Sequence, residues 1–144
     1  MHLYLCVTIG APAERVWETI EVIDTHTRWM TDAESITFRS DQHAGVGTEF
    51  ECLTRVGPFT TVDLMRVTQW EPGVAMGIEH HGIVTGSGRF ELRPAGAGIT
   101  EFCWDEDLQF PVRLGGAVVA RLGRPVFERI WRANLRRLRD LVEG

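Results

Sequence analysis

The residues best suited to acid–base chemistry are one histidine and two acids that share faces with apolar side chains. On the segment 98–110, the side chains that alternate onto the face of Glu106 are Thr100, Phe102, Trp104, Leu108 and Phe110. Because this face is mostly apolar, it is predicted to point inward. Burial beside Trp104 would raise the pKa of Glu106 and suit it to proton transfer or to binding a ligand hydroxyl or amine. Alternatively, Glu106 lies at a cavity mouth and pairs with an arginine.

His80 lies on the apolar side of the segment 74–81. Its companions on that side are Val74, Met76 and Ile78. An inward histidine could act as an acid, a base or a hydrogen-bond donor to a ligand carbonyl. The alternative is a core histidine whose ring is satisfied by the backbone or by water.

Asp63 is a second candidate interior acid, on the segment 59–71. The proposed inward face of that segment consists of Thr61, Asp63, Met65 and Val67. Trp70 breaks this alternation, which predicts a bulge near the end of the strand. Asp63 would then neighbour His80 on the adjacent strand, where the pair could orient a proton shuttle or form a structural hydrogen bond.

An apolar wall is expected around these three groups. Two glycines, Gly86 and Gly88, share a face of 83–93 and could leave room for a ligand or for a helix; as an alternative they mark a bulge. The residues predicted to contact a ligand are Trp104, Phe102, Phe90, Met76, Met65, Ile78, Gly88 and Phe110.

Metal and cofactor chemistry has no matching motif. All fifteen basic residues are arginine, which excludes lysine nucleophiles and a P-loop lysine. His80 and His81 are adjacent strand residues and point to opposite faces, so they are not a metal pair. The odd number of cysteines (Cys6, Cys52 and Cys103) and the absence of CxxC suggest neither a disulfide framework nor a zinc site. We therefore expect no metal, no cofactor, reduced thiols and a cytoplasmic location.

Length and composition predict a single globular domain over residues 1–144. The chain is 44% hydrophobic and 24% charged. Residues 1–17 lack the features of a secretory signal and no apolar run is long enough to span a membrane, so we expect neither. Residues 1–110 hold 7 Arg against 17 acids, whereas residues 111–144 hold 8 Arg against 3 acids. The acidic body argues against a nucleic-acid partner. Neither a monomer nor a homodimer is excluded.

The order of elements predicts an α+β fold. A strand at 3–9 precedes two short helices, one beginning at Pro12 and one running from Asp24 to Trp29. Six strands follow, at 34–40, 47–55, 59–71, 74–81, 83–93 and 98–110. Short connections make them antiparallel, and the resulting seven-stranded sheet can curl around a long helix at 112–142 and leave a cavity between them.

That final helix carries two further expectations. Pro125 should kink or break it, and Gly115-Gly116 could make its first half a movable lid or a fixed break needed for packing. Arginines including Arg129, Arg132 and Arg136 share the face opposite its apolar stripe. They are expected to be solvated or to pair with the acidic body, although a basic helix can also bind anionic membranes.

Several local sequences resemble the START-like SRPBCC superfamily, and especially its polyketide cyclase/dehydrase branch. They are IGAPAERVWETI at 9–20, GVGTEF at 45–50, VTQWEPG at 67–73, GSGRFELRP at 86–94 and WRANLRRLRDLV at 131–142. The resemblance covers nearly the whole chain. It implies a helix-grip fold with a hydrophobic cavity, but no single activity, because members include lipid carriers, aromatase/cyclases and chaperone-associated modules.

Three functions are compatible with this sequence. The first is binding or transport of a small hydrophobic ligand, such as a lipid or polyketide, in the cavity. The second is a polyketide cyclase/dehydrase in which His80, Asp63 or Glu106 assists aldol closure and water loss. The third is an interaction module that docks on a protein or membrane surface through the basic helix. The first is favoured because no residue set has the arrangement of a nucleophile and its base.

Overall fold

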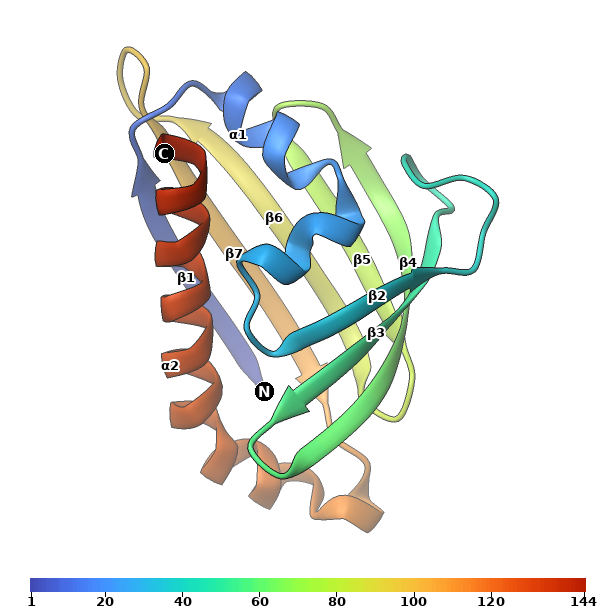
Figure 1. Cartoon of the computed structure of the whole chain (residues 1–144). Helices are drawn as coiled ribbons and strands as arrows, with labels where there is room; N and C mark the ends of the chain where they lie inside the picture. The colour runs from blue at the N-terminus through green and yellow to red at the C-terminus, as the bar shows by residue number, and fades with distance from the viewer.

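The computed structural model describes residues 1–144 and contains a single curved sheet that partly surrounds one long helix (Figure 1). The strands are β1 (His2–Ile9), β2 (Ala33–Phe38), β3 (Glu49–Val56), β4 (Phe59–Glu71), β5 (Ala75–His81), β6 (Thr85–Pro94) and β7 (Thr100–Gln109). The helices are α1 (Ala13–Ile20), the 3-10 helix η1 (Ile23–Arg28), the 3-10 helix η2 (Val112–Leu114) and α2 (Gly116–Glu143). The predicted α+β helix-grip architecture is confirmed.

The seven strands form one antiparallel sheet in the order β1-β7-β6-β5-β4-β3-β2. Each strand from β2 to β7 pairs with its neighbour in sequence, as short connections require, and β1 closes the order by pairing with β7. Figure 1 shows α2 lying along the β1 end of the sheet, while α1 and η1 cross the concave face beside the C-terminal part of α2. The cavity described below is lined by residues of η1, of α2 and of the concave face.

Alternation predicted the concave face of the sheet correctly. On β7, the side chains from Thr100 to Leu108 that share the face of Glu106 are all buried. On β4, Asp63 and Val67 are buried, and the ladder to β5 shifts register between Val67 and Gln69, where the bulge was expected. Val74 is an exception, because it precedes β5 and is exposed.

The final helix runs through Pro125 without a break. Proline has no N–H to donate to the preceding turn, and Figure 1 shows that the helix changes direction in its first half. Its second half buries Trp131, Leu135 and Leu138 against the sheet. Gly115 has a φ of 100°, which explains the glycine at this junction with η2. No helix of the structure is long and apolar enough to cross a membrane.

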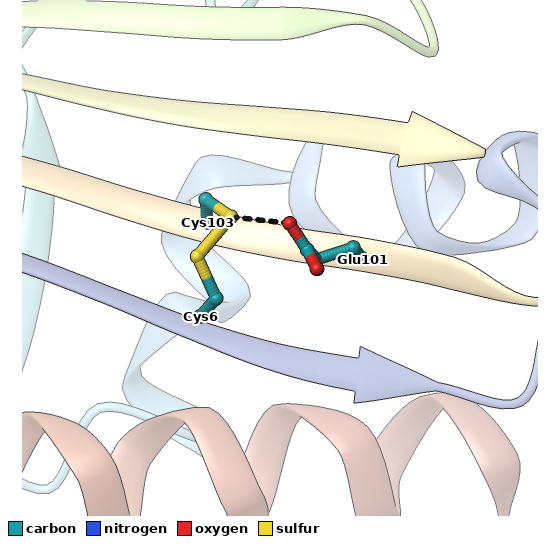
Figure 2. A group of neighbouring side chains, drawn as sticks. All are labelled: Cys6, Glu101 and Cys103. Carbon is teal, nitrogen blue, oxygen red and sulfur yellow. Dashed lines mark hydrogen bonds between the residues drawn. A yellow bond between two sulfur atoms is a disulfide. The ribbon is translucent and has the colours of Figure 1, made fainter. Parts of the chain in front are cut away.

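The expectation of three reduced thiols was wrong. Cys6 on β1 lies directly opposite Cys103 on β7, with their Cα atoms 4.1 Å apart, and the two form a disulfide (Figure 2). The separation is typical of closely facing residues on antiparallel strands. Sequence spacing could not reveal this pair because 97 residues separate the cysteines. The cytoplasmic location stays a prediction, and free thiols at Cys6 and Cys103 no longer support it.

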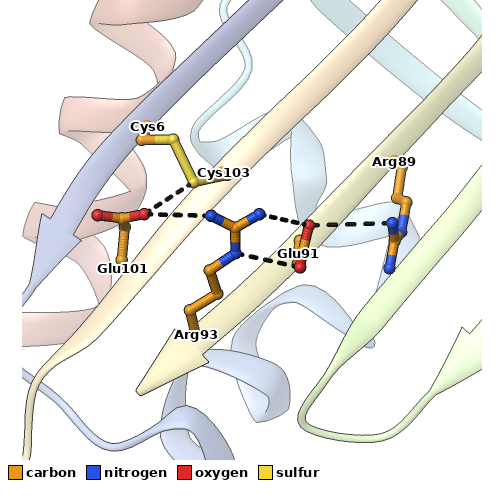
Figure 3. Close-up of a disulfide and its surroundings, with 6 residues drawn as sticks. All are labelled: Cys6, Arg89, Glu91, Arg93, Glu101 and Cys103. Carbon is orange, nitrogen blue, oxygen red and sulfur yellow. Dashed lines mark hydrogen bonds and ion pairs between the residues drawn. A yellow bond between two sulfur atoms is a disulfide. The ribbon is translucent and has the colours of Figure 1, made fainter. Parts of the chain in front are cut away.

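Charged side chains surround the disulfide on the convex face of the sheet. Arg93 lies between Glu91 and Glu101, and Glu101 lies beside the disulfide (Figure 3). One oxygen of Glu101 and the two sulfurs lie within 4.8 Å of one another. Zinc binds cysteine as thiolate, and sulfurs joined in a disulfide are not thiolates. The cluster in this state is therefore an ionic surface rather than a metal centre.

Candidate functional site

A cavity of about 620 Å³ lies between the concave face of the sheet, η1, β2 and α2. Most of the residues that line it are hydrophobic. Its outer part is lined by Val56, Phe59, Ile83, Leu114, Val119 and Val126. The exposure of Phe59, Leu114 and Val126 identifies this end as the mouth, between the β3–β4 turn and the first half of α2. Size and apolar lining are those of a small-molecule site.

Glu106 and His80 form the central polar pair of the cavity. Nε2 of His80 on β5 is hydrogen-bonded to Oε1 of Glu106 on β7; the Glu106 side chain is buried and that of His80 is 9% exposed. The indole Nε1 of Trp104 donates to the other carboxylate oxygen at 2.8 Å. Glu106 is therefore paired with a histidine rather than with the arginine considered as an alternative. The arrangement places a proton donor and its acceptor side by side in an apolar wall.

Gly88 makes this pairing possible. The strand β6 separates β5 from β7, and Gly88 lies directly opposite Glu106 in the ladder. A Cβ at position 88 would lie 2.1 Å from Oε2 of Glu106. The carboxylate therefore crosses β6 over the space that a side chain would fill. The space that was predicted at Gly88 for a ligand or a helix is occupied by the carboxylate of Glu106.

Gly86 has a backbone role. Its φ is +140°, and a Cβ there would lie 1.9 Å from the carbonyl oxygen of Asp107. Neither a ligand nor α2 accounts for this glycine, because the close approach is to the backbone of β7.

The pKa of His80 is raised above its ordinary value. Burial lowers it, but the hydrogen bond to Glu106, the charge of Glu106 and the charge of Asp63 together outweigh burial. The protonated imidazole is thus favoured in the folded protein. His80 is suited to donate a proton or a charged hydrogen bond to a ligand.

Asp63 does not form the hydrogen bond with His80 that was considered. Its Oδ2 accepts from the hydroxyl of Thr54 on β3 at 2.7 Å, and its effect on His80 is through its charge. Together with Glu106 and His80, these side chains form a line across the sheet from β7 to β3, which we call the polar row (Glu106, His80, Asp63 and Thr54). The three predicted acid–base residues are therefore brought together, with Glu106 rather than Asp63 bonded to the histidine.

Asp32 is a cavity acid that sequence reasoning missed. It lies just before β2, where Nδ2 of Asn134 donates to its Oδ1 at 2.7 Å and Nε1 of Trp131 lies 3.3 Å from its Oδ2. The fully buried Asn134 also accepts from the backbone N–H and the hydroxyl of Thr31 at 3.0 Å. One amide of α2 thus holds the loop before β2 in place. The sequence signal that could have revealed this contact is Asn134, a polar residue within the apolar stripe at 126–142.

The two tryptophans beside these acids stack on each other. The rings of Trp104 and Trp131 lie 4.7 Å apart at 21°. Trp104 donates to Glu106 and Trp131 faces Asp32, so the stacked pair links the two carboxylates. Trp131 thereby belongs to the wall of the cavity.

His26 on η1 is a second cavity histidine that the sequence did not single out. Its ring donates to the carbonyl of Ile20 at 2.7 Å. Burial lowers its pKa to about 4, although the bond to Ile20 and the charge of Asp24 oppose the shift. The ring is therefore neutral at pH 7 and serves as a structural side chain.

The two histidines give opposite pH dependence to stability. Between pH 4 and 6.5 the unfolded chain binds a proton at His26 that the folded chain does not, so stability falls by about 3 kcal/mol as the pH drops through this window. Above pH 6.5 the folded chain holds a proton at His80 that the unfolded chain loses, so this contribution declines as the pH rises through the raised pKa.

Urea unfolding from pH 4 to 9 should therefore give a maximum near pH 6.5. His26→Gln, whose amide can still donate to Ile20, should flatten the acid side, and His80→Gln should flatten the alkaline side. A His26→Gln protein with the acid slope of the unchanged chain would contradict the assignment.

Seven of the eight predicted ligand-contact residues line the cavity. They are Trp104, Phe90, Met76, Met65, Ile78, Gly88 and Phe110. Phe102 does not line it: the ring is 0% exposed and packs against Phe90 in the core, with ring centroids 5.2 Å apart. Phe102 shares the inward face of β7, but its end of the strand lies under α1 and α2, where the core is filled.

The family model for polyketide cyclase/dehydrase and lipid transport proteins matches residues 2–143. The chain belongs to this family. A search of curated proteins found no significant match.

Solved structures confirm the fold. TTHA0849 from Thermus thermophilus superposes with a TM-score of 0.85 at 15% identity, covering 99% of this chain and 97% of that one. The ZhuI aromatase/cyclase from Streptomyces sp. R1128 gives 0.80 at 18% identity, covering 99% and 93%. A START superfamily protein from Mycobacterium smegmatis gives 0.77 at 14% identity, covering 97% and 98%.

Proposed function

We propose that the protein binds a small hydrophobic ligand in the cavity between the sheet and α2. The observation that carries the proposal is a cavity of about 620 Å³ whose lining is mostly hydrophobic, with a few polar groups gathered in the polar row and at Asp32. Aromatic side chains such as Trp104 and Phe90 supply the apolar contacts, and His80 orients the ligand. The partner is a small molecule rather than a nucleic acid.

A second candidate function is that of a polyketide cyclase/dehydrase. The hydrogen-bonded His80–Glu106 pair favours it, because aldol closure needs an acid and a base: a carboxylate of the polar row would take the proton from the attacking carbon, and the protonated imidazole would give a proton to the carbonyl oxygen as the carbon–carbon bond forms. The apolar wall would fold a poly-β-ketone so that its reacting carbons meet, and loss of water would follow. Asp63 would stabilise the protonated histidine without contacting it.

One experiment distinguishes binding alone from catalysis. Native mass spectra of the purified protein report any bound molecule, and a poly-ketone mimic is then assayed with the unchanged chain and with His80→Ala and Glu106→Ala. His81→Ala is the matched control, since His81 is the adjacent histidine on the outer face and is exposed. Binding alone predicts retained ligand and no turnover. A turnover loss of about 100-fold with retained binding in the His80 and Glu106 variants would establish catalysis instead.

Docking through the basic helix is the remaining function to test. Arg132 pairs with Glu128 and Arg139 with Asp140, so these arginines bond within their own helix rather than with the acidic sheet. Binding to anionic vesicles that falls with salt and with neutralisation of Arg129, Arg132 and Arg136 would support docking. Unchanged binding in that triple variant would remove it.

A further inference from the structure

The charges inside the cavity are unbalanced. Its lining contains three carboxylates, those of Asp32, Asp63 and Glu106. His80 is the cation among them, and it is hydrogen-bonded to Glu106. Arg89 also belongs to the lining, but its guanidinium lies 3.9 Å from Glu91 on the convex face (Figure 3). Asp32 and Asp63 thus face the cavity without an ion-pair contact to a cation of the lining.

Asp63 is the less satisfied of these two acids. Asp32 has two side-chain N–H groups directed at its oxygens, from Asn134 and Trp131. Asp63 is 8% exposed and receives one side-chain hydrogen bond, on Oδ2 from Thr54. An ionised carboxylate offers about four acceptor positions, and burying one costs free energy unless donors surround it. Oδ1 of Asp63 has no donor from the protein and is not itself enclosed, so it is accessible to a ligand.

The pKa of the Cys52 thiol reflects the same excess of negative charge in the cavity. It lines the cavity, and its pKa is raised to about 11, mainly by burial, with the charges of Asp63 and Asp32 adding to the effect. A carboxylate or phosphate on a ligand would enter this field and find no free cation. A protonated amine would find Asp63, and aromatic rings such as Trp104 and Phe59 also attract cations.

We propose that the cavity selects a ligand with an apolar, aromatic body and a basic nitrogen, and that Asp63 binds that nitrogen as an ion pair. This inference rests on the proposed binding function and adds the chemical class of the ligand. It assigns Asp63 a role in specificity, distinct from the acid–base role considered for it above. Anionic lipids are excluded by the same charges that attract the amine.

Three probes with one ring system test the proposal: anthracen-9-ylmethylamine, the corresponding 9-anthracenemethanol and 9-anthracenecarboxylate. Calorimetry at pH 7 should show the amine binding about tenfold or more tightly than the alcohol, and the carboxylate more weakly than the alcohol. Asp63→Asn keeps the size of the side chain and should reduce the preference for the amine to less than about threefold. The affinity of the alcohol should stay unchanged, which shows that the cavity is intact.

Asp107→Asn is the matched control, because Asp107 follows Glu106 on β7 but points outward and is exposed. It should leave all three affinities unchanged. Equal binding of amine and alcohol, tighter binding of the carboxylate, or an amine preference that survives in Asp63→Asn would overturn the inference while leaving the binding function standing. If none of the three probes binds, the binding function and the inference fail together. The order of the three probe affinities in the unchanged protein still tests the proposal if the Asp63→Asn variant does not fold.

Discussion

Gly88→Ala is expected to destabilise the fold by about 3 kcal/mol and to separate Glu106 from His80. The added Cβ would lie 2.1 Å from Oε2 of Glu106 and 2.8 Å from its carboxyl carbon, so the carboxylate must leave its place. Its hydrogen bonds with His80 and Trp104 are then lost. Overpacking costs about 1–3 kcal/mol and a charged hydrogen bond about 1.5–3 kcal/mol. Urea unfolding measures the loss, and NMR titration of His80 should show its pKa falling.

A double-mutant cycle identifies the cause of that loss. In a Glu106→Ala background the carboxylate is absent, so Gly88→Ala should cost less than about 1 kcal/mol, which is near the intrinsic difference between the two residues. In a Glu106→Gln background the side chain keeps its size, and the part of the cost that comes from overpacking should remain. Equal costs in all three backgrounds would mean that the strand β6, rather than Glu106, requires glycine.

Asn134→Asp is expected to destabilise the protein by about 2–4 kcal/mol at pH 7.5. The amide that donates to Asp32 at 2.7 Å becomes a carboxylate, and two acids then face each other across a buried contact. Such a pair binds a proton at a higher pH than a lone acid does. The stability difference from the unchanged chain should therefore shrink as the pH falls to about 5.

Two further variants make this result specific to the Asp32–Asn134 contact. Asn134→Leu removes the donor without adding a second carboxylate, so its cost should change with pH less steeply than that of Asn134→Asp. The exchange Asp32→Asn with Asn134→Asp restores one donor and one acceptor, and it should recover most of the stability. A pH-independent loss in Asn134→Asp, or no recovery in the exchange, would show that Asn134 acts through packing alone.

Alternation along the strands was enough to predict which side of each strand faces inward, although not that Phe102 lies in the filled core rather than in the cavity wall. His80, Asp63 and Glu106 were each identified because a polar residue stood on an apolar face, and period two decides the face without knowledge of the register. The order of elements was enough for the helix-grip architecture, because short connections between successive strands leave few other arrangements. The bulge near Trp70 was predicted in the same way, from a break in the pattern.

Contacts between distant segments could not be predicted. The pairing of Glu106 with His80 depends on a side chain that crosses β6, which requires both the register and the absence of a Cβ at Gly88. The disulfide depends on the register of β1 against β7. The placement of Asp32 depends on a loop meeting a helix residue 102 positions away. Periodicity describes one strand or helix at a time, so it could not predict these three contacts between different elements.

The disulfide makes one part of the chain a covalent ring and leaves the C-terminal helix outside that ring. Residues 6–103 form a covalent ring that includes β2 to β6 and closes at the edge where β1 meets β7. In a chain-entropy account, a ring of this size lowers the conformational entropy of the unfolded chain and thereby stabilises the folded state by about 4–5 kcal/mol. The helix α2 lies outside the ring and is tethered to it at one end through η2. The ring therefore restrains the sheet that forms the cavity wall, whereas α2 is held on that sheet by noncovalent contacts such as those of Trp131, Leu135 and Leu138.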